Sequence, residues 1–377
     1  MSVTFTWDDF PEIYDSKPTP EIDADTSPLE NTLFIGDNYP VLKALNEKDL
    51  KVDLIYIDPP YNTGNTFVYN DDFSQKGDRH SKWLSFMYRR LNLAKQMLVE
   101  SGCIFIAIDQ SELYVLKLLC DQIFGEENFV NDFMWLHGKG KKDRWSRTLQ
   151  QHTLCYAKNK KQLGEFTETE YTDWAKTNAD NDPRGNWFSG SISFTEKRSN
   201  PNHKNYYSIT SPGGKTWTRQ WQLSESEMKK MISEQKIFWG KAPEYNKVPR
   251  KKVFNETPAK VIPRNIIEKV ETTRSAQNHL NDLLGESGLF DNPKPVDLIM
   301  HLIEITQMSK DAVILDFFAG SGTTFEAVCE LNKKDNGKRR CLLVQKDENS
   351  IAGVTIKRCK KVCNIFNTSI NIVDTQC

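Results

Sequence analysis

The chain has 377 residues, of which 38% are hydrophobic and 27% are charged, and its mean hydropathy is −0.60. This length can bury a sizeable core and suits an enzyme with two structural units. No apolar run approaches the roughly 18 residues that a membrane span requires, and the N-terminus has neither the basic start nor the apolar stretch of a secretion signal. We therefore expect a cytoplasmic protein.

The net charge of −1 conceals a basic middle, because residues 137–260 contain 24 Lys and Arg against 13 Asp and Glu. This asymmetry is typical of a chain in which one part faces nucleic acid. The eight cysteines are scattered and lie mostly in apolar stretches, so we expect them to be reduced. Cys359 and Cys363 have no second Cys or His pair to complete a zinc site, so no bound metal is expected.

The N-terminal half shows an alternation of strands and helices after a leading arm. Residues 1–30 are rich in Pro, Asp and Thr without periodicity, which predicts an arm that packs over the surface or is partly disordered. Short apolar runs then predict buried parallel strands, at 32–36, 52–57 and 103–108. Amphipathic patterns over 80–98 and 113–124 predict the helices between and after them.

The alternation stops after Asn159, where about a hundred residues become aromatic, basic and turn-rich, and this change predicts an inserted unit. It returns as helix, strand, helix and strand, at 295–306, 313–317, 321–331 and 341–345. We therefore expect one α/β domain with a doubly wound, mostly parallel sheet built from both outer segments. The expected divisions are an arm at 1–30, a first half at 31–160, an insert at 161–275 and a second half at 276–377.

Asp58, Pro59, Pro60 and Tyr61 directly follow the predicted strand 52–57, at the edge where open α/β sheets bind ligands. Two prolines make the loop rigid and remove two donors. The amine of a nucleobase is a weak nucleophile, and acceptors at its N–H groups, the Asp58 carboxylate and the Pro59 carbonyl, favour the pyramidal nitrogen that attacks a methyl group. Tyr61 offers a ring for an extruded base. The alternative is an ordinary turn in which Asp58 caps a helix.

A second candidate loop runs from Asp316 to Thr324, between a predicted strand and a predicted helix. Its two glycines allow a tight turn and a close approach of the backbone to a ligand. No Lys follows the second glycine in phosphate-loop spacing. A nucleoside with a charged amino-acid tail needs such a backbone approach together with nearby carboxylates.

With the first loop before the second and an insert between them, the chain resembles the beta group of amino-methyltransferases acting on DNA. Within that group it resembles the modification subunits of type III restriction systems. The similarity extends from about Asn31 to about Lys361 and includes further short segments, at 36–38, 80–87, 156–159, 182–185, 275–278 and 293–296.

The resemblance implies a Rossmann-like, circularly permuted methyltransferase that uses S-adenosylmethionine, with Asp58, Pro59, Pro60 and Tyr61 as the catalytic loop. Lys294 would close over the methionine carboxylate. Gln345 stands where the family usually has an acidic residue for the ribose hydroxyls, and its amide can still hydrogen-bond a hydroxyl. The implied cofactor residues are Asp37, Lys294, Pro295, Asp316, Phe317, Phe318, Gly320, Ser321, Gly322, Thr323, Thr324 and Gln345.

The resemblance also implies methylation of the N6 amine of adenine in duplex DNA by base flipping, in restriction-modification or epigenetic marking. A restriction subunit and a second copy of the chain are the implied protein partners. Cations in the basic middle would supply phosphate contacts. The candidate DNA-binding residues are Lys139, Lys141, Lys142, Arg144, Arg184 and Trp187.

Three other functions remain open at this point. The target could be the N4 amine of cytosine, although a loop that begins with Asp is usual in adenine enzymes. The substrate could be RNA adenine. The chain could also be a catalytically silent subunit that only binds DNA. A nicotinamide dehydrogenase is disfavoured, since no GxGxxG follows a strand.

Overall fold

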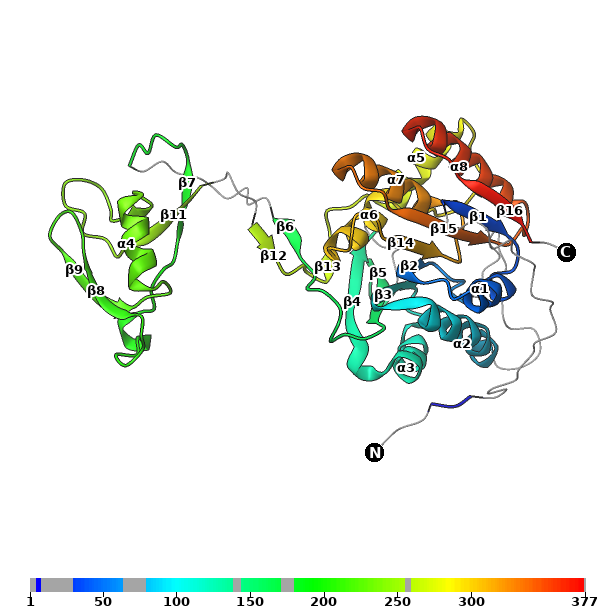
Figure 1. Ribbon diagram of the computed structural model, residues 1–377, viewed down its shortest axis with the longest axis horizontal. Coiled ribbons are helices and arrows are strands. Elements are labelled where there is room, and N and C mark those ends of the chain that lie inside the picture. The colour runs from blue at the N-terminus through cyan, green and yellow to red at the C-terminus, as the bar shows by residue number, and fades with distance from the viewer. Residues whose placement is uncertain are drawn as a thin grey trace. The chain divides into compact units, whose positions relative to one another are not determined.

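The computed structural model in Figure 1 describes residues 5–7, 30–63, 79–137, 144–170, 180–254 and 259–375. The chain divides into two compact units: Met1–Thr167 together with Ile262–Cys377, and Glu168–Val261. The second unit begins and ends inside the insert predicted for 161–275. None of the described helices is long and apolar enough to cross a membrane.

The first unit is built on one large sheet. Its described strands are β1 (Thr32–Ile35), β2 (Val52–Ile57), β3 (Leu98–Ile108), β4 (Phe129–Leu136), β5 (Gln150–Ala157), β13 (Ile266–Ile267), β14 (Val313–Asp316), β15 (Arg340–Gln345) and β16 (Asn371–Asp374). Their order is β13-β4-β5-β3-β2-β14-β15-β1-β16. β5 runs antiparallel to its two neighbours, and the other pairs are parallel. The predicted mostly parallel sheet is confirmed.

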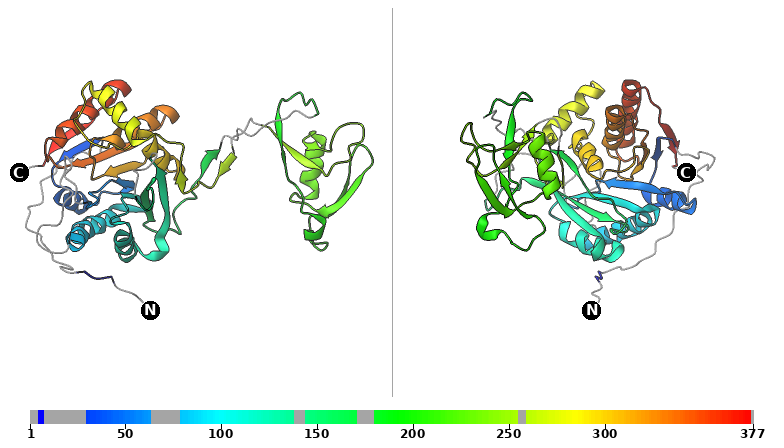
Figure 2. Two further views of the ribbon diagram at one scale, coloured as in Figure 1. Left: turned by 180° about the vertical axis from the view of Figure 1, so that it is seen from behind. Right: turned by 60° about the vertical axis from the view of Figure 1, so that its left-hand side comes forward.

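Helices cover both faces of this sheet, as two views show (Figures 1 and 2). One face carries α1 (Asn38–Glu47), α2 (Arg79–Met97) and α3 (Leu113–Phe124), and the other carries α6 (Val296–Ile305), α7 (Thr323–Asp335) and α8 (Ile351–Phe366). α5 (Thr273–Leu284) packs on α8 through Leu280 and Val354. The sheet is therefore doubly wound, as predicted.

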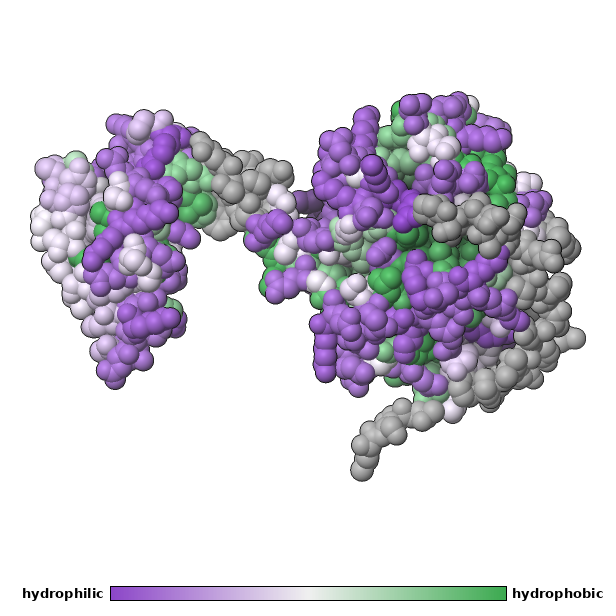
Figure 3. Space-filling view, viewed as in Figure 1, coloured by the Kyte–Doolittle hydropathy of each residue, from purple (hydrophilic) through white to green (hydrophobic). Residues whose placement is uncertain are grey.

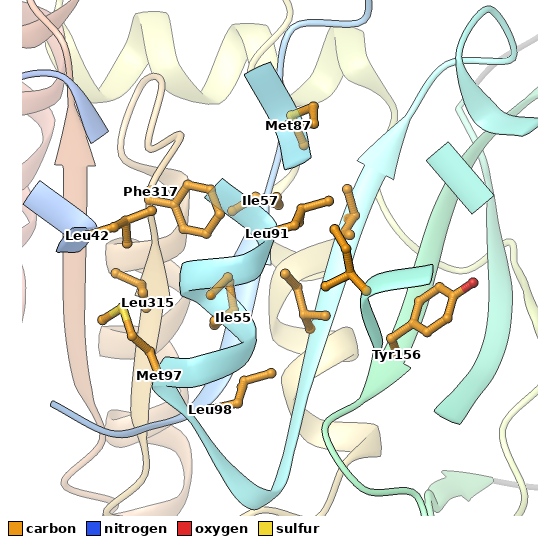
Figure 4. Packing of buried hydrophobic residues seen from close by; sticks show 14 of the residues in the cluster. Leu42, Ile55, Ile57, Met87, Leu91, Met97, Leu98, Tyr156, Leu315 and Phe317 are labelled. Carbon is orange, nitrogen blue, oxygen red and sulfur yellow. The ribbon is translucent and has the colours of Figure 1, made fainter. Parts of the chain in front are cut away.

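Alternation along β2 assigns its side chains to two cores. Ile55 and Ile57 face the first core, which also contains Leu42 and Leu91 (Figure 4). Leu54 and Tyr56 face the second core beneath α6 and α7. Successive side chains of a strand point to opposite faces, so Tyr56 shares the face of Leu54, and Asp58 directly follows the end of β2.

β2 and β14 are adjacent, with Leu54 opposite Ile314 and Ile55 opposite Leu315. The chain continues from β2 to β3 on one side and from β14 to β15 on the other. This is the switch point at which open α/β sheets bind ligands. The two candidate loops therefore follow neighbouring strands.

The leading arm is described only at residues 5–7 and 30, and the rest of 1–30 lies outside the described residues. The indole Nε1 of Trp7 donates to Ser85 Oγ on α2 at 2.8 Å. The Phe5 N–H donates to Gln122 Oε1 on α3 at 3.1 Å. This short piece therefore lies on α2 and α3.

The second unit, Glu168–Val261, is small and has its own core. It contains β6 (Glu168–Glu170), β7 (Trp187–Gly190), β8 (Tyr206–Thr210), β9 (Thr216–Gln220), α4 (Glu225–Ser233), β10 (Ile237–Phe238), β11 (Arg250–Phe254) and β12 (Ala259–Val261). The described 3-10 turns are Glu126–Asn128 in the first unit and Glu196–Arg198 here. Trp217, Trp221, Met228 and Trp239 pack together, which gives several tryptophans of the basic middle a structural role.

Candidate active site

A cavity of about 290 Å³ lies at the carboxyl ends of the central strands of the first unit. Its lining includes these predicted site residues: Asp37, Asp58, Pro60, Lys294, Asp316, Phe317, Phe318, Gly320, Ser321, Thr323, Thr324 and Gln345. The other predicted catalytic and cofactor residues, Pro59, Tyr61, Gly322 and Pro295, belong to the same two loops or precede α6 directly. The fold thus gathers residues that are more than 250 positions apart in the sequence around one cavity.

The loop after β2 is held by polar contacts on several sides. The indole Nε1 of buried Trp83 donates to the Pro60 carbonyl at 2.7 Å. The Tyr61 hydroxyl donates to one Asp58 oxygen and accepts from the Gln151 amide. These contacts leave little freedom to the loop beyond that removed by its prolines.

The other Asp58 oxygen accepts a hydrogen bond from the Lys294 ammonium, which also lies 5.3 Å from the centre of the Tyr61 ring. The side chain of Lys294 is 11% exposed and that of Asp58 is 27% exposed, so the pair is only partly screened by water. Sequence reasoning predicted a cofactor carboxylate as the partner of Lys294. The structure shows that Lys294 has an alternative partner in Asp58, on the loop after β2.

A buried cluster that sequence reasoning missed anchors the residue after the loop. Asn62 has a positive φ of 55°, a conformation that Asn tolerates. Its amide donates to Glu112 Oε1 at 2.6 Å, and His80 Nδ1 lies 2.6 Å from the same oxygen. Glu112 is fully buried, and this burial raises the pKa of its carboxyl. Only tertiary contact reveals this cluster, because its members come from three separate segments.

The glycine-rich loop turns tightly around the buried carboxylate of Asp316. Asp316 Oδ2 accepts from the Thr324 hydroxyl at 2.5 Å, and Oδ1 accepts from the Phe318 N–H at 3.0 Å. Gly320 and Gly322 have φ values of 53° and 84°, which strongly favour glycine. Burial raises the pKa of Asp316 to about 7, opposed by those two hydrogen bonds.

Gln345 at the end of β15 supports this loop. Its side-chain oxygen accepts from the Gly320 N–H at 2.7 Å, and its amide nitrogen donates to the Lys346 carbonyl at 2.8 Å. The contact of Gln345 with ribose hydroxyls stays a prediction. The structure shows a second role for this side chain, because its hydrogen bond orients the Gly320 peptide.

Arg358 on α8 is a further residue that sequence reasoning missed. It is 1% exposed, and its Nη1 donates to Ser321 Oγ at 2.9 Å and to Thr323 Oγ1 at 2.8 Å. Its Nε donates to Glu326 Oε2 at 2.7 Å, so the buried charge is paired. The sequence signal that could have revealed Arg358 is its place within the apolar stripe of a helix, because a buried cation needs partners.

Asp37 caps α1 by accepting from the Tyr39 N–H at 3.0 Å, and it also pairs with Arg90 Nη2 at 3.0 Å. Arg90 Nε donates to Asn38 Oδ1, whose amide donates to the Phe317 carbonyl, both at 2.6 Å. Burial lowers the pKa of Arg90 to about 10, although Asp37 favours its charged form. Because Arg90 pairs with Asp37, the negative charge of Asp37 is locally balanced.

The candidate DNA-binding residues have different outcomes. Trp187 is 2% exposed, and its indole Nε1 donates to Asp180 Oδ1 at 3.0 Å. This contradicts its predicted place on a DNA-binding surface, because its ring belongs to the core of the second unit. Arg184 binds the Asp182 carboxylate through Nε at 2.9 Å and Nη2 at 2.8 Å. The Arg184 side chain therefore contributes an ion pair to the second unit, and its contact with DNA stays a prediction.

Lys139, Lys141 and Lys142 lie outside the described residues. Arg144 is exposed, and its guanidinium lies 4.9 Å from the centre of the Trp145 ring. Hydrophilic residues also cover much of the face of the second unit that Figure 3 shows. Of these candidates, Arg144 and Arg184 are the ones that the structure describes as exposed.

The described residues include no group of three or more His, Cys, Asp and Glu that could hold a metal ion. The polar groups around the cavity are instead backbone N–H groups, carboxylates, hydroxyls, side-chain amides, the ammonium groups of Lys294 and Lys346 and the guanidinium of Arg90. Such a set suits an organic ligand with charged groups.

Residues 52–359 match a protein family described as DNA methylase. The matched segment spans both loops and the unit between them. The chain belongs to this family. The type III restriction-modification enzyme StyLTI Mod subunit of Salmonella typhimurium is 33% identical over 86% of the chain and 54% of its own length. The EcoPI Mod subunit of Escherichia phage P1 is 36% identical over 85% of the chain and 58% of its own length.

The type II methyltransferase M.KpnI of Klebsiella pneumoniae is 31% identical over 85% of the chain and 82% of its own length. The resemblance to modification subunits that the motifs indicated is therefore confirmed. The chain spans little more than half the length of the two Mod subunits and about four fifths of M.KpnI.

Proposed function

We propose that the protein transfers a methyl group from S-adenosylmethionine to the N6 amine of adenine at a specific site in duplex DNA. The observation that carries this proposal is the meeting of the Asp58 loop and the Asp316–Thr324 loop at one cavity on the switch point of the sheet. Membership of the DNA methylase family and the names of the relatives support it.

The cavity suits the cofactor on structural grounds. A Cβ at residue 320 would come within 3.2 Å of the Phe290 ring. The room for a ligand beside Gly320 therefore depends on the lack of a side chain at this residue. The peptides of this loop would bind the methionine end, and the Asp37 end of the cavity would receive the adenosine. When bound, the cofactor supplies a methyl group activated by a positively charged sulfur.

In the proposed reaction the chain's own residues orient the target amine. The Asp58 carboxylate and the Pro59 carbonyl accept its two N–H groups, and Asp58 or water takes the proton that is released. Tyr61 stacks on the extruded base. The Lys294 ammonium competes with the amine for Asp58, and a cofactor carboxylate would draw Lys294 away.

A first prediction concerns Asp316, whose pKa is raised to about 7 by burial. Below that pH the carboxyl is mostly neutral, and above it the carboxylate attracts the cationic methionine end. The affinity for S-adenosylmethionine should therefore rise, roughly tenfold, between about pH 5.5 and about pH 7.5. Calorimetric titration of wild type and Asp316→Asn across this range checks it, since the variant should show a flatter profile. An affinity independent of pH in wild type contradicts the prediction.

Methyl transfer itself is the test of the proposed function. The protein is incubated with S-adenosylmethionine carrying a labelled methyl group and with duplex DNA, and the nucleosides are then separated. We expect label on N6-methyladenine alone. Label on N4-methylcytosine, or transfer to structured RNA in place of DNA, would replace the proposal by one of these activities. Cofactor and DNA binding without transfer would indicate a silent subunit.

Two protein partners are proposed from the similarity to the relatives and not from the geometry of the cavity. Three of the relatives are named Mod subunits of type III restriction-modification enzymes. We propose on this ground that a restriction subunit binds the chain, and a homodimer stays a prediction from the same resemblance.

A further inference from the structure

The Tyr56 hydroxyl is a buried polar group whose presence the packing of the fold does not explain. Tyr56 lies on β2 two residues before Asp58, is 3% exposed and lines the cavity. Its ring packs in the second core. Its hydroxyl oxygen has no hydrogen-bond partner among the described residues. Buried hydroxyls are nearly always paired, and an unpaired one lowers stability. Phenylalanine would fill the same core space without this cost, so the hydroxyl itself requires an explanation.

Negative charge surrounds this hydroxyl. Asp58 follows two residues later, directly beyond the end of β2, and lines the same cavity. On the neighbouring strand β14, Asp316 follows Leu315, which is paired with Ile55. Burial first, and then both carboxylates, raise the pKa of Tyr56 well above its ordinary value. The phenol therefore stays protonated, with a lone pair free to accept. Lys294 balances only one of the two carboxylates when Asp316 is ionised. Above a pH of about 7, where Asp316 is mostly ionised because its pKa is raised to about 7, the vicinity therefore carries one excess negative charge and favours a cation.

We infer that Tyr56 is a cofactor-binding residue whose hydroxyl oxygen accepts a hydrogen bond from the α-ammonium group of S-adenosylmethionine. This inference rests on the proposed function. An ammonium brings a positive charge and several N–H donors, which suits an acceptor between two carboxylates. A carboxylate at this point would be repelled by Asp58 and Asp316. The sulfonium carries charge but has no N–H to donate.

The test is Tyr56→Phe, which removes one oxygen and keeps the ring. Dissociation constants are measured by calorimetry for S-adenosylmethionine, S-adenosylhomocysteine, decarboxylated S-adenosylmethionine and 5′-methylthioadenosine. The first three ligands have the amine, and their affinities should fall about tenfold or more in the variant, as for a hydrogen bond to a charged group. Methylthioadenosine has no amine, and its affinity should not change. The cofactor-free variant should melt at or above the temperature of wild type, because it no longer buries an unpaired hydroxyl.

Tyr156→Phe is the matched control. The Tyr156 hydroxyl is also in a buried tyrosine, but it donates to Asp121 Oδ1 at 2.7 Å and does not line the cavity. This control should lower the melting temperature and leave all four affinities unchanged.

Each alternative result has a distinct meaning. Unchanged affinity of Tyr56→Phe for S-adenosylmethionine overturns the inference and leaves the proposed function intact. Equal weakening of methylthioadenosine also overturns it, since the hydroxyl would then act outside the amino-acid end. Weakening of S-adenosylmethionine but not of its decarboxylated form would assign the hydroxyl to the carboxylate instead. If wild type binds no S-adenosylmethionine, the proposed function and this inference fall together.

Discussion

Replacement of Asp58 by alanine is expected to slow methyl transfer by roughly 10²-fold or more, because the variant loses a preorganised acceptor for the target amine. Cofactor binding should persist, since the glycine-rich loop is held by Gln345 and Arg358 rather than by Asp58. Loss of Asp58 also releases the Lys294 ammonium for a cofactor carboxylate. The same change removes a carboxylate that favours the ammonium of the cofactor, so we expect an affinity for S-adenosylmethionine close to that of wild type.

Single-turnover rates with saturating DNA and cofactor, beside a calorimetric titration of the cofactor, check both parts of this prediction. Asp311→Ala serves as the control, because Asp311 is an exposed carboxylate outside the cavity lining. Methyl transfer by Asp58→Ala at the rate of this control would refute the proposed mechanism. A large loss of cofactor affinity would instead show that Asp58 acts in binding.

Replacement of Gly320 by valine is expected to weaken S-adenosylmethionine binding by roughly 10²-fold or more while the protein stays folded. Gly320 has a φ of 53°, which a β-branched residue adopts only with strain, and its Cβ would press on Phe290 at 3.2 Å. The loop must then move, and the N–H of residue 320 would lose its hydrogen bond to the Gln345 side chain.

Calorimetry and thermal unfolding of the variant check this prediction together. Gly214→Val is the control, because Gly214 also has a positive φ, of 85°, but its Cβ would meet nothing within 4 Å, and it lies in the second unit. This control carries the backbone strain without disturbing the cavity, so it should bind the cofactor normally. Normal binding by Gly320→Val would show that the cofactor lies elsewhere.

Much of the first unit could be predicted because local patterns agree with its long-range packing. β2, β14 and β15 occur within one or two residues of the predicted strands. β3 begins at Leu98, five residues before the predicted run, because the segment after α2 pairs with Val52 before it becomes continuously apolar. The prediction that Trp187 contacts DNA was wrong, and the one for Arg184 stays a prediction, for a different reason. Aromatic and basic residues are typical both of DNA-binding surfaces and of small cores with ion pairs.

By itself the sequence determined the fold class, the order of the two loops and the family, because these depend on residue type and spacing along the chain. Only the tertiary structure decided which side chains meet. The Lys294–Asp58 pair, the Glu112 cluster, the Arg358 contacts and the unpaired Tyr56 hydroxyl join segments far apart in the sequence or depend on what surrounds a buried atom. A hydrogen bond or a buried charge is set by distances of a few ångströms in space, and the one-dimensional pattern does not contain those distances.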